Sequence, residues 1–233
     1  LPLGLLDASY ITGMRTGASG AIGAKYLARP DSSHLLVVGC GGQAIFQIAA
    51  MLTAFPGLRQ VTVSNPRSLS RAEAFVSTLP RRLTEEFGLS VSAVRFAAAA
   101  SPEQALETAD VVITVTPSRA PLIQKEWVRS GTHFSCIGAD AEGKEELDPR
   151  LFSGACVFVD DAVHCTLAGE VELPLKQGIL RPEDISGEIG DLLLGKLPGR
   201  ADARQTTIFD ATGMALLDLA AAKTALDTAA QLG

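Results

Sequence analysis

Short apolar runs alternate with amphipathic segments along most of the chain, and turn residues follow the runs. The first run, at 35–38, reads Leu-Leu-Val-Val, which is typical of a strand buried on both faces of a parallel sheet. Further strands are expected at 60–64, 91–96, 111–115, 133–137 and 157–159. Helices are expected between them, at 44–55, at about 70–87 with a break at Pro80, and from 102. This alternation predicts an α/β fold with a doubly wound parallel sheet.

The two ends of the chain have a different pattern. A first helix begins at a cap provided by Asp7 or Ser9 and is rich in glycine and alanine, so another backbone can pack very close to it. After Asp160 the chain is mostly helical, with one strand at 207–209 and a last helix at 214–232. We expect the first and last helices to make the contacts of a homodimer.

The segment after the first predicted strand fits the G-x-G-x-x-A pattern of a dinucleotide-binding turn. Gly39 makes the tight turn, Gly41 lets the backbone approach a pyrophosphate, and Ala44 permits close packing of helix on strand. The helix N-terminus, with Gly42 and Gln43 before it, supplies amide donors and a partial positive charge. A glycine-rich turn can also be purely structural, but a buried strand before it and a helix after it favour nucleotide binding. The pattern therefore predicts a Rossmann-type site.

The end of the second predicted strand bears on which cofactor binds. An enzyme that uses NAD usually has an acidic residue here for the ribose hydroxyls, and this chain has none. Asn65, Arg67 and Ser68 stand there instead, and they can hold a 2′-phosphate. We therefore expect NADP, with NAD as the alternative if Arg67 merely points into solvent.

Composition and charge exclude several classes of protein. The 233 residues carry a net charge of −6 and are 47% hydrophobic, which argues against a disordered chain and against a nucleic-acid partner. No apolar run approaches the length of a membrane helix, so we expect no membrane partner. The four cysteines lack the paired spacing of a metal or redox site, and the three histidines are scattered, so no metal is expected. Free thiols indicate a reducing, cytoplasmic location.

A series of segments resembles the ornithine cyclodeaminase/μ-crystallin family over nearly the whole chain. In order, they are 14–18 (Met-Arg-Thr-Gly-Ala), 39–44 (Gly-Cys-Gly-Gly-Gln-Ala), 109–112 (Ala-Asp-Val-Val), 116–121 (Thr-Pro-Ser-Arg-Ala-Pro), 137–140 (Ile-Gly-Ala-Asp), 143–149 (Gly-Lys-Glu-Glu-Leu-Asp-Pro) and 209–215 (Phe-Asp-Ala-Thr-Gly-Met-Ala). The resemblance implies a dinucleotide-binding domain at 29–206. It also implies part of a second domain, for substrate and dimer contacts, at 1–28 and 207–233. Most of its N-terminal portion is expected to precede this chain, which opens without Met.

The resemblance also assigns roles to residues. Arg15 matches the position that holds the substrate carboxylate, and a planar guanidinium suits a carboxylate. Asp140 matches the acid/base, although an aspartate in a charged turn can equally be structural. Lys144 and Glu145, in the same loop, are expected to be solvated or structural. The nicotinamide end of the cofactor is expected to contact Thr116, Pro117, Ser118, Thr212 and Gly213.

Three activities are compatible with this resemblance. The leading expectation is hydride transfer between a nicotinamide and an α-amino or α-imino acid, as in a cyclic imino-acid reductase or an amino-acid dehydrogenase. An ornithine cyclodeaminase would instead expel ammonia, form proline and regenerate its cofactor. A μ-crystallin-like protein would bind NADP and a ligand without turnover. Retention of Arg15 and Asp140 argues against a purely structural role.

Overall fold

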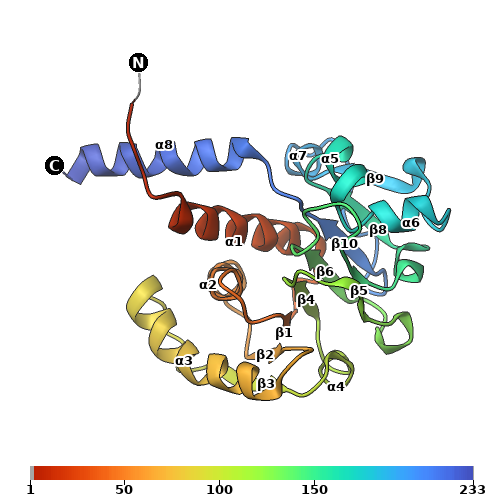
Figure 1. The fold of residues 1–233 in the computed structure, drawn as a ribbon, viewed down its shortest axis with the longest axis horizontal. Coiled ribbons are helices and arrows are strands. Elements are labelled where there is room, and N and C mark those ends of the chain that lie inside the picture. Colours follow the sequence, from red (N-terminus) through yellow and green to blue (C-terminus); the bar gives the residue numbers. More distant parts are fainter. Residues whose placement is uncertain (1–2, 233) are drawn as a thin grey trace.

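A parallel sheet of eight strands forms the middle layer of the structure, a computed structural model that describes residues 3–232. In spatial order the strands are β3 (Arg95–Ala99), β2 (Gln60–Ser64), β1 (His34–Val38), β4 (Val111–Thr114), β6 (His133–Cys136), β10 (Thr207–Asp210), β8 (Cys156–Val159) and β9 (Ile185–Glu188). Every neighbouring pair is parallel, and the order reverses at β1, where the chain crosses from β3 back to β4 (Figure 1). The predicted doubly wound, Rossmann-type sheet is confirmed.

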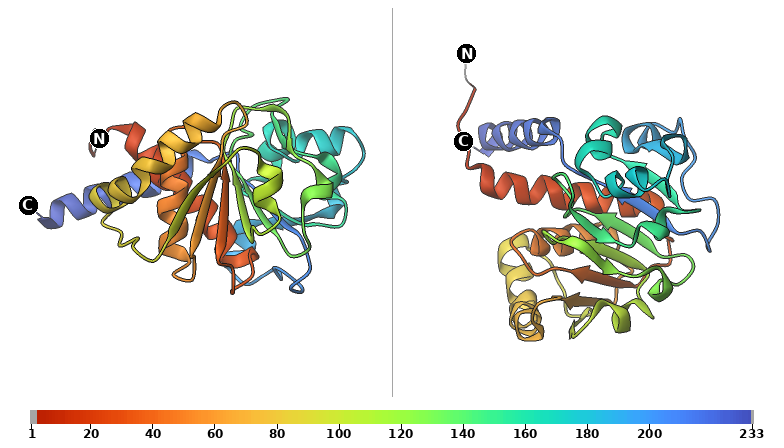
Figure 2. Two further views of the ribbon diagram at one scale, coloured as in Figure 1. Left: turned by 90° about the horizontal axis from the view of Figure 1, so that it is seen from below. Right: turned by 45° about the vertical axis from the view of Figure 1, so that its right-hand side comes forward.

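Helices cover both faces of the sheet. They are α1 (Ala8–Leu27), α2 (Ala44–Ala54), α3 (Leu69–Phe87), α4 (Pro102–Leu106), α5 (Ala162–Ala168), α6 (Glu172–Lys176), α7 (Ile189–Leu193) and α8 (Ala215–Leu232). Three short 3-10 turns, η1 (Lys125–Trp127), η2 (Pro149–Phe152) and η3 (Pro182–Asp184), complete the helical elements of the described residues. Alternation along β1 separates two apolar cores: Leu35 and Val37 pack with α1, α2 and α3, whereas Leu36 and Val38 pack with α4 and α5. Figure 2 shows the helices on the two sides of the sheet.

Helix α1 packs unusually close to its neighbours through a face of glycines. A Cβ added at Gly17 would lie 2.5 Å from the carbonyl oxygen of Phe46 in α2, and one at Gly23 would lie 2.2 Å from the Phe209 ring in β10. The predicted cap is also present, because the Asp7 side chain accepts from the Ser9 amide at 2.8 Å. Close packing therefore occurs as expected, but within one chain. The glycine face is already occupied, so it does not support a dimer in the way that the sequence suggested.

Pro80 does not break α3, contrary to the expectation from sequence. The helix is continuous from Leu69 to Phe87 and ends at Gly88, whose φ is +67°. A proline in a helix costs about 3 kcal/mol. Burial of Leu79 and Leu83 against the apolar core offsets that cost, since each full burial of such a side chain contributes roughly 1.5–3 kcal/mol.

The sequence misplaced or missed the less regular strands. The third strand was expected at 91–96, but Val91 and Val94 form a turn and the alanine-rich segment of β3 pairs with β2. Strand β9 was missed, as was a second, two-stranded sheet of β5 (Arg119–Ile123) and β7 (Glu145–Leu147). These segments carry glycine, proline or charged residues, so they lack the apolar run by which strands were recognised.

Strand β10 lies inside the main sheet, hydrogen-bonded to β6 on one side and β8 on the other. A domain boundary at residue 207, as expected from the sequence, would therefore separate the central strand β10 from the rest of its sheet. Helix α8 leaves the sheet after β10 and runs beside α1 in the opposite direction (Figure 1). The division into two domains, at 1–28 with 207–233 and at 29–206, stays a prediction.

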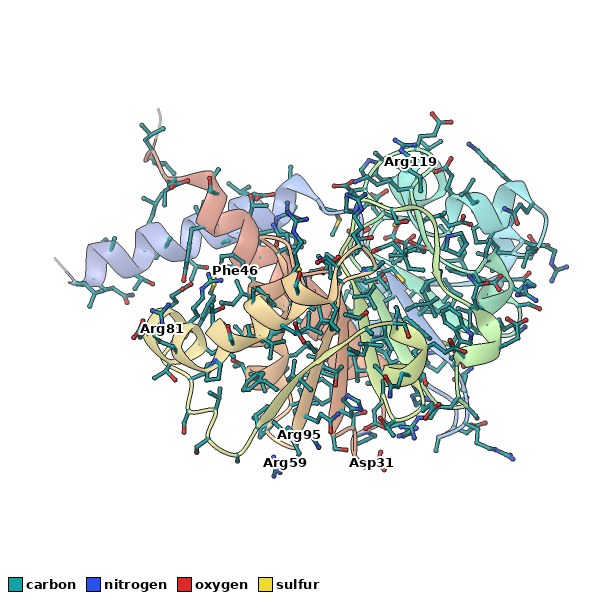
Figure 3. The ribbon with its side chains drawn as sticks, turned by 60° about the horizontal axis from the view of Figure 1, so that its bottom comes forward. Asp31, Phe46, Arg59, Arg81, Arg95 and Arg119 are labelled. Carbon is teal, nitrogen blue, oxygen red and sulfur yellow. The ribbon has the colours of Figure 1, made fainter. Side chains whose placement is uncertain are left out.

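The strands all end at one edge of the sheet, where the loops that carry the candidate site gather. Figure 3 shows Arg119, which follows β4, at this edge, whereas Asp31, Arg59 and Arg95 lie at the opposite end, before or at the start of their strands. Among residues 3–232, no helix combines the length and apolar character needed to cross a bilayer.

Candidate functional site

The glycine turn after β1 has the geometry that a phosphate-binding turn requires. Gly39 has a φ of +118°, and a Cβ there would lie 2.6 Å from the carbonyl oxygen of Val115, so only glycine fits. Added Cβ atoms at Gly41 and Gly42 would instead meet no atom within 4 Å. These two positions therefore leave a cradle open in front of α2, and Ala44 is fully buried behind it.

A groove of about 500 Å³ extends from this turn. It is lined by Gly39, Cys40, Gly41, Asn65, Pro66, Arg67, Arg71, Ala74, Val115, Thr116, Pro117, Ser118 and Leu122. The groove thus joins the glycine turn to the ends of β2 and β4, as the sequence predicted for a dinucleotide. Among residues 3–232, no acidic residue lines it, and Arg67 and Arg71 are the cations in its lining.

Two predicted cofactor residues have other structural tasks. The Asn65 side chain donates to the Cys40 sulfur at 2.9 Å and accepts from the Arg67 amide at 2.9 Å, so it joins the end of β2 to the glycine turn. Ser68 caps α3 by accepting from the Arg71 amide at 3.3 Å, and it is not among the residues that line the groove. Its predicted contact with the cofactor remains untested.

A second cavity, of about 120 Å³, brings together residues from distant parts of the sequence. It is lined by Thr12, Arg15, Thr16, Ser19, Gln43, Ile137, Asp140, Ala211, Thr212 and Gly213. The candidate carboxylate-binding Arg15 and the candidate acid/base Asp140 therefore share one cavity. Thr212 and Gly213, expected at the nicotinamide, also line it, and Gln43 connects it to the start of α2.

Arg15 lines this cavity and is tied to α8. Its Nε donates to Asp218 Oδ1 of α8 at 3.2 Å. Gly213 has a φ of +91°, and a Cβ there would lie 2.8 Å from Arg15 Nη1. A side chain at this position would meet the guanidinium, and the predicted contact of Gly213 with the nicotinamide stays a prediction.

Asp140 forms an ion pair with Lys144, a contact that the sequence analysis did not predict. Lys144 Nζ also donates to the carbonyl oxygen of Gly138 at 3.3 Å, and only 19% of its side chain is exposed. The Asp140 side chain is 56% exposed and remains accessible to a ligand. The spacing of four residues was a signal for this pair, but the loop is not helical, so the helical rule did not apply.

Asp160, at the end of β8, is a second group that sequence reasoning missed. Its carboxylate accepts from the Gly213 amide at 2.7 Å and from the Thr212 hydroxyl at 3.2 Å, and it is buried. It therefore fixes the loop that closes one side of the small cavity. The sequence signals were an aspartate directly after a predicted strand and the resemblance of Val159-Asp160 to the family, but neither assigned it a role.

Buried carboxylates lie behind the site. Burial raises the pKa of Glu146 and of Asp210 to about 7, and it raises that of Glu170 well above the ordinary value. Asp210 Oδ2 accepts from the Val171 amide at 3.1 Å, while Oδ1 has no partner among the described residues. An unpartnered, fully buried oxygen favours the protonated acid.

The raised pKa of Asp210 gives an expected pH dependence of stability. The folded state binds a proton that unfolded aspartate, with a pKa near 3.9, has lost, so this stabilisation is complete at low pH and disappears as pH rises through about 7. When the pH rises from about 5.5 to about 8.5, the loss of this proton should lower the free energy of unfolding by about 2 kcal/mol. Asp210→Asn should therefore flatten the fall in Tm over this range.

Asp148→Asn is the matched control for this experiment. Although burial opposes it, hydrogen bonds from Arg150 hold the pKa of this carboxyl below its ordinary value. Its replacement should leave the alkaline fall in Tm unchanged. An equal fall in wild-type protein and in Asp210→Asn, measured by thermal unfolding at both pH values, would contradict the assignment.

Comparison with known proteins places the chain in a family. The model of the ornithine cyclodeaminase/mu-crystallin family matches residues 1–232. The chain belongs to this family. The resemblance expected from the sequence is thereby confirmed.

Two relatives in the family are enzymes of amino and imino acids. The alanine dehydrogenase of Archaeoglobus fulgidus is 39% identical over 98% of this chain and 66% of its own length. The iminosuccinate reductase of Paracoccus denitrificans is 34% identical over 97% of this chain and 66% of its own length. The chain therefore spans slightly less than two thirds of these relatives.

Solved structures in the family share the fold. The Δ1-pyrroline-2-carboxylate reductase of Thermococcus litoralis, in complex with NADH and L-proline, superposes with a TM-score of 0.91 at 28% identity, over 100% of this chain and 69% of that one. An archaeal alanine dehydrogenase dimer with bound NAD gives 0.88 at 38% identity, over 99% and 68%. The bound NADH and NAD are named for these two neighbour structures.

Proposed function

We propose that the protein to which this chain belongs transfers hydride between a nicotinamide cofactor and an α-amino or α-imino acid. The observation that carries this proposal is that one turn, 39–43, contributes to both sites: Gly39 and Gly41 line the open groove, and Gln43 lines the small cavity that holds Arg15 and Asp140. Gly41 and Gly42 fit a pyrophosphate, because the space in front of them is empty of protein atoms. The names of relatives and neighbours, which include reductases and dehydrogenases with NAD or NADH, support the same reaction class.

The two polar groups in the cavity suit the two ends of such a substrate. The Arg15 guanidinium would hold the carboxylate through paired hydrogen bonds. The nicotinamide, when bound, supplies or accepts the hydride at the α-carbon. Asp140 would donate a proton to the nitrogen during imine reduction and remove one during amine oxidation. Lys144, ion-paired with Asp140, would hold that carboxylate at the mouth of the cavity.

A turnover assay on the full-length protein tests this proposal. The probes are Δ1-pyrroline-2-carboxylate, pyruvate with ammonia, and, in reverse, alanine and ornithine, with nicotinamide oxidation and free ammonia both measured. Stoichiometric oxidation of NADH or NADPH with an imine supports a reductase or dehydrogenase. Ammonia release from ornithine without net change in the cofactor would identify a cyclodeaminase. Cofactor binding without turnover of any probe would overturn the enzymatic proposal.

We further propose that the preferred cofactor carries a 2′-phosphate. Arg67 and Arg71 line the adenosine end of the groove with Asn65, and no carboxylate is present there to pair with ribose hydroxyls or to repel a phosphate. NAD or NADH is named in the neighbour structures, so the preference rests on the residues of this chain.

Arg67→Ala is therefore expected to weaken NADPH binding by about tenfold to a hundredfold and to change NADH binding little. A charge-assisted hydrogen bond contributes about 1.5–3 kcal/mol, and only NADPH offers the phosphate. Arg81→Ala is the control, because this exposed arginine of α3 pairs with Glu85 and does not line the groove. Titration of both cofactors by fluorescence gives the dissociation constants. Equal binding of the two cofactors by the wild type would refute the preference.

We also propose a homodimer for the full-length protein. Helix α8 has no buried residue in this chain, and Leu216 and Leu219 are 67% and 66% exposed along it. A dimer is named for the archaeal alanine dehydrogenase neighbour. Light scattering at micromolar concentration would measure the mass, and a monomer would contradict the proposal.

A further inference from the structure

A fully buried glutamate joins the loop at the end of β4 to the loop that carries Asp140. Glu146 lies in the middle of β7 and has no exposed surface. Its Oε1 accepts from the Thr116 amide at 2.7 Å, and its Oε2 accepts from the Gly138 amide at 3.1 Å. One carboxylate therefore ties together the second residues after two neighbouring strands of the sheet, β4 and β6.

Both hydrogen bonds act on the candidate site. Thr116 lines the cofactor groove, and Gly138 begins the loop that carries Asp140 and Lys144. That loop begins at Gly138 and ends at Glu146. The hydrogen bond from the Gly138 amide to Glu146 therefore also joins the two ends of the loop. Glu146 thus helps to set the position of Asp140 relative to the groove, together with the Asp140–Lys144 ion pair and the hydrogen bond from the Glu145 amide to the carbonyl oxygen of Ser118.

The junction formed by Glu146, Thr116 and Gly138 is tightly packed. A Cβ at Gly138 would lie 2.3 Å from Glu146 Oε2 and 2.3 Å from the carbonyl oxygen of Thr116. The backbone of Glu146 is fixed in turn, since its amide and that of Leu147 both donate to Glu170 Oε1, at 2.8 and 2.6 Å. Glu170 is itself buried, so the arrangement extends into the core and does not depend on solvent.

We propose that Glu146 is a positioning residue, which holds the cofactor loop and the Asp140 loop at the separation needed for coupled hydride and proton transfer. This inference rests on the proposed function. The two hydrogen bonds require two acceptor oxygens on one short side chain, and a carboxylate provides both. A glutamine has one acceptor oxygen, and its amide nitrogen would face a backbone N–H. One of the two loops must then lose its contact.

Glu146→Gln in the full-length protein is the central test. We expect kcat, normalised to sites titrated with NADH or NADPH, to fall by about tenfold or more, because a misplacement of about 1 Å can cost that much. KM and the cofactor dissociation constant should change far less. The primary deuterium isotope effect from 4-deuterated cofactor should rise, because hydride transfer becomes more strongly rate-limiting. A merely structural role would lower the number of active sites and leave the isotope effect unchanged.

Glu145→Gln is the matched control. This neighbouring glutamate is also buried and also has a pKa raised by burial, but its carboxylate accepts from neither loop amide. It should retain the wild-type isotope effect and normalised kcat. Equal kinetic defects in the two variants, or a wild-type normalised kcat in Glu146→Gln, would overturn the proposal.

Amide hydrogen exchange separates this inference from the proposed reaction. The measurement on the wild type does not depend on whether the variant folds. In wild-type protein without cofactor, the Thr116 and Gly138 amides should be protected like those inside β4 and β6, and in Glu146→Gln one of them should exchange much faster. Rapid exchange of both amides in the wild type would refute the junction, whatever the substrate proves to be. Normal protection without turnover of any probe would count against the proposed function and leave the junction supported.

Discussion

Asp140→Asn is expected to reduce turnover by about a hundredfold or more while cofactor affinity stays near the wild-type value. The asparagine keeps the size of the side chain but can neither take up nor release the proton that imine reduction or amine oxidation requires. The defect should appear in kcat, because Arg15, which lines the same cavity, would still hold the substrate under the proposed function. Steady-state kinetics with the best substrate, together with a cofactor titration, measure both quantities.

The control for Asp140→Asn lies two residues further along the same loop. Glu142 is 80% exposed, pairs with Lys176 and does not line the small cavity. Glu142→Gln removes the same charge from the same loop and should keep turnover within about twofold of wild type, as expected for an exposed ion pair. Wild-type turnover in Asp140→Asn would exclude this residue as the acid/base.

Gly17→Ala is expected to lower the free energy of unfolding by about 2–3 kcal/mol, which is roughly a thirty- to 150-fold change in the folding equilibrium. The added methyl group would lie 2.5 Å from the carbonyl oxygen of Phe46, and that atom belongs to the backbone of α2 and cannot rotate away. The same substitution in an open helical position usually stabilises by up to about 1 kcal/mol. The sign of the effect therefore reports on the contact between α1 and α2.

Gly190→Ala provides the matched comparison in urea denaturation. Gly190 lies in α7, and a Cβ there would meet no atom within 4 Å. We expect this variant to be as stable as the wild type or slightly more stable. If Gly17→Ala behaved in the same way, the packing of α1 against α2 would have to be looser than the structure describes.

The regular part of the fold was predictable because its signals are local. Buried parallel strands are typically continuous apolar runs, and β1, β4 and β8 show that pattern in the sequence. The glycine turn was predictable for a related reason, since Gly39 meets a conformational requirement that lies within its own backbone. Pro80 shows the limit of local rules, because burial of the surrounding apolar face decides whether a helix continues.

The candidate site was only partly predictable. Residues alone did not indicate that Arg15 and Asp140 share a cavity, and the family resemblance supplied that expectation. The groups that fix the site were missed for one physical reason, namely that their contacts span long stretches of sequence. Glu146 contacts an amide 30 residues away, and Asp160 holds a loop more than 50 residues away. Hydrophobic periodicity carries no information about such pairs.

The central place of β10 has a consequence for the order in which the polypeptide can fold during synthesis. Strands β1 to β4 and β6 can pair once residue 136 has left the ribosome, and β8 can pair with β9 once residue 188 has done so. These two partial sheets cannot join until residues 207–210 arrive, because β10 bonds to β6 and β8 at once. Until then the nascent chain presents two open strand edges, beside Phe134 and Phe158, which are fully buried in the finished sheet. Joining of the two partial sheets is therefore a long-range step that waits for residues 207–210, and a chain that stops before residue 207 keeps both edges available for aggregation.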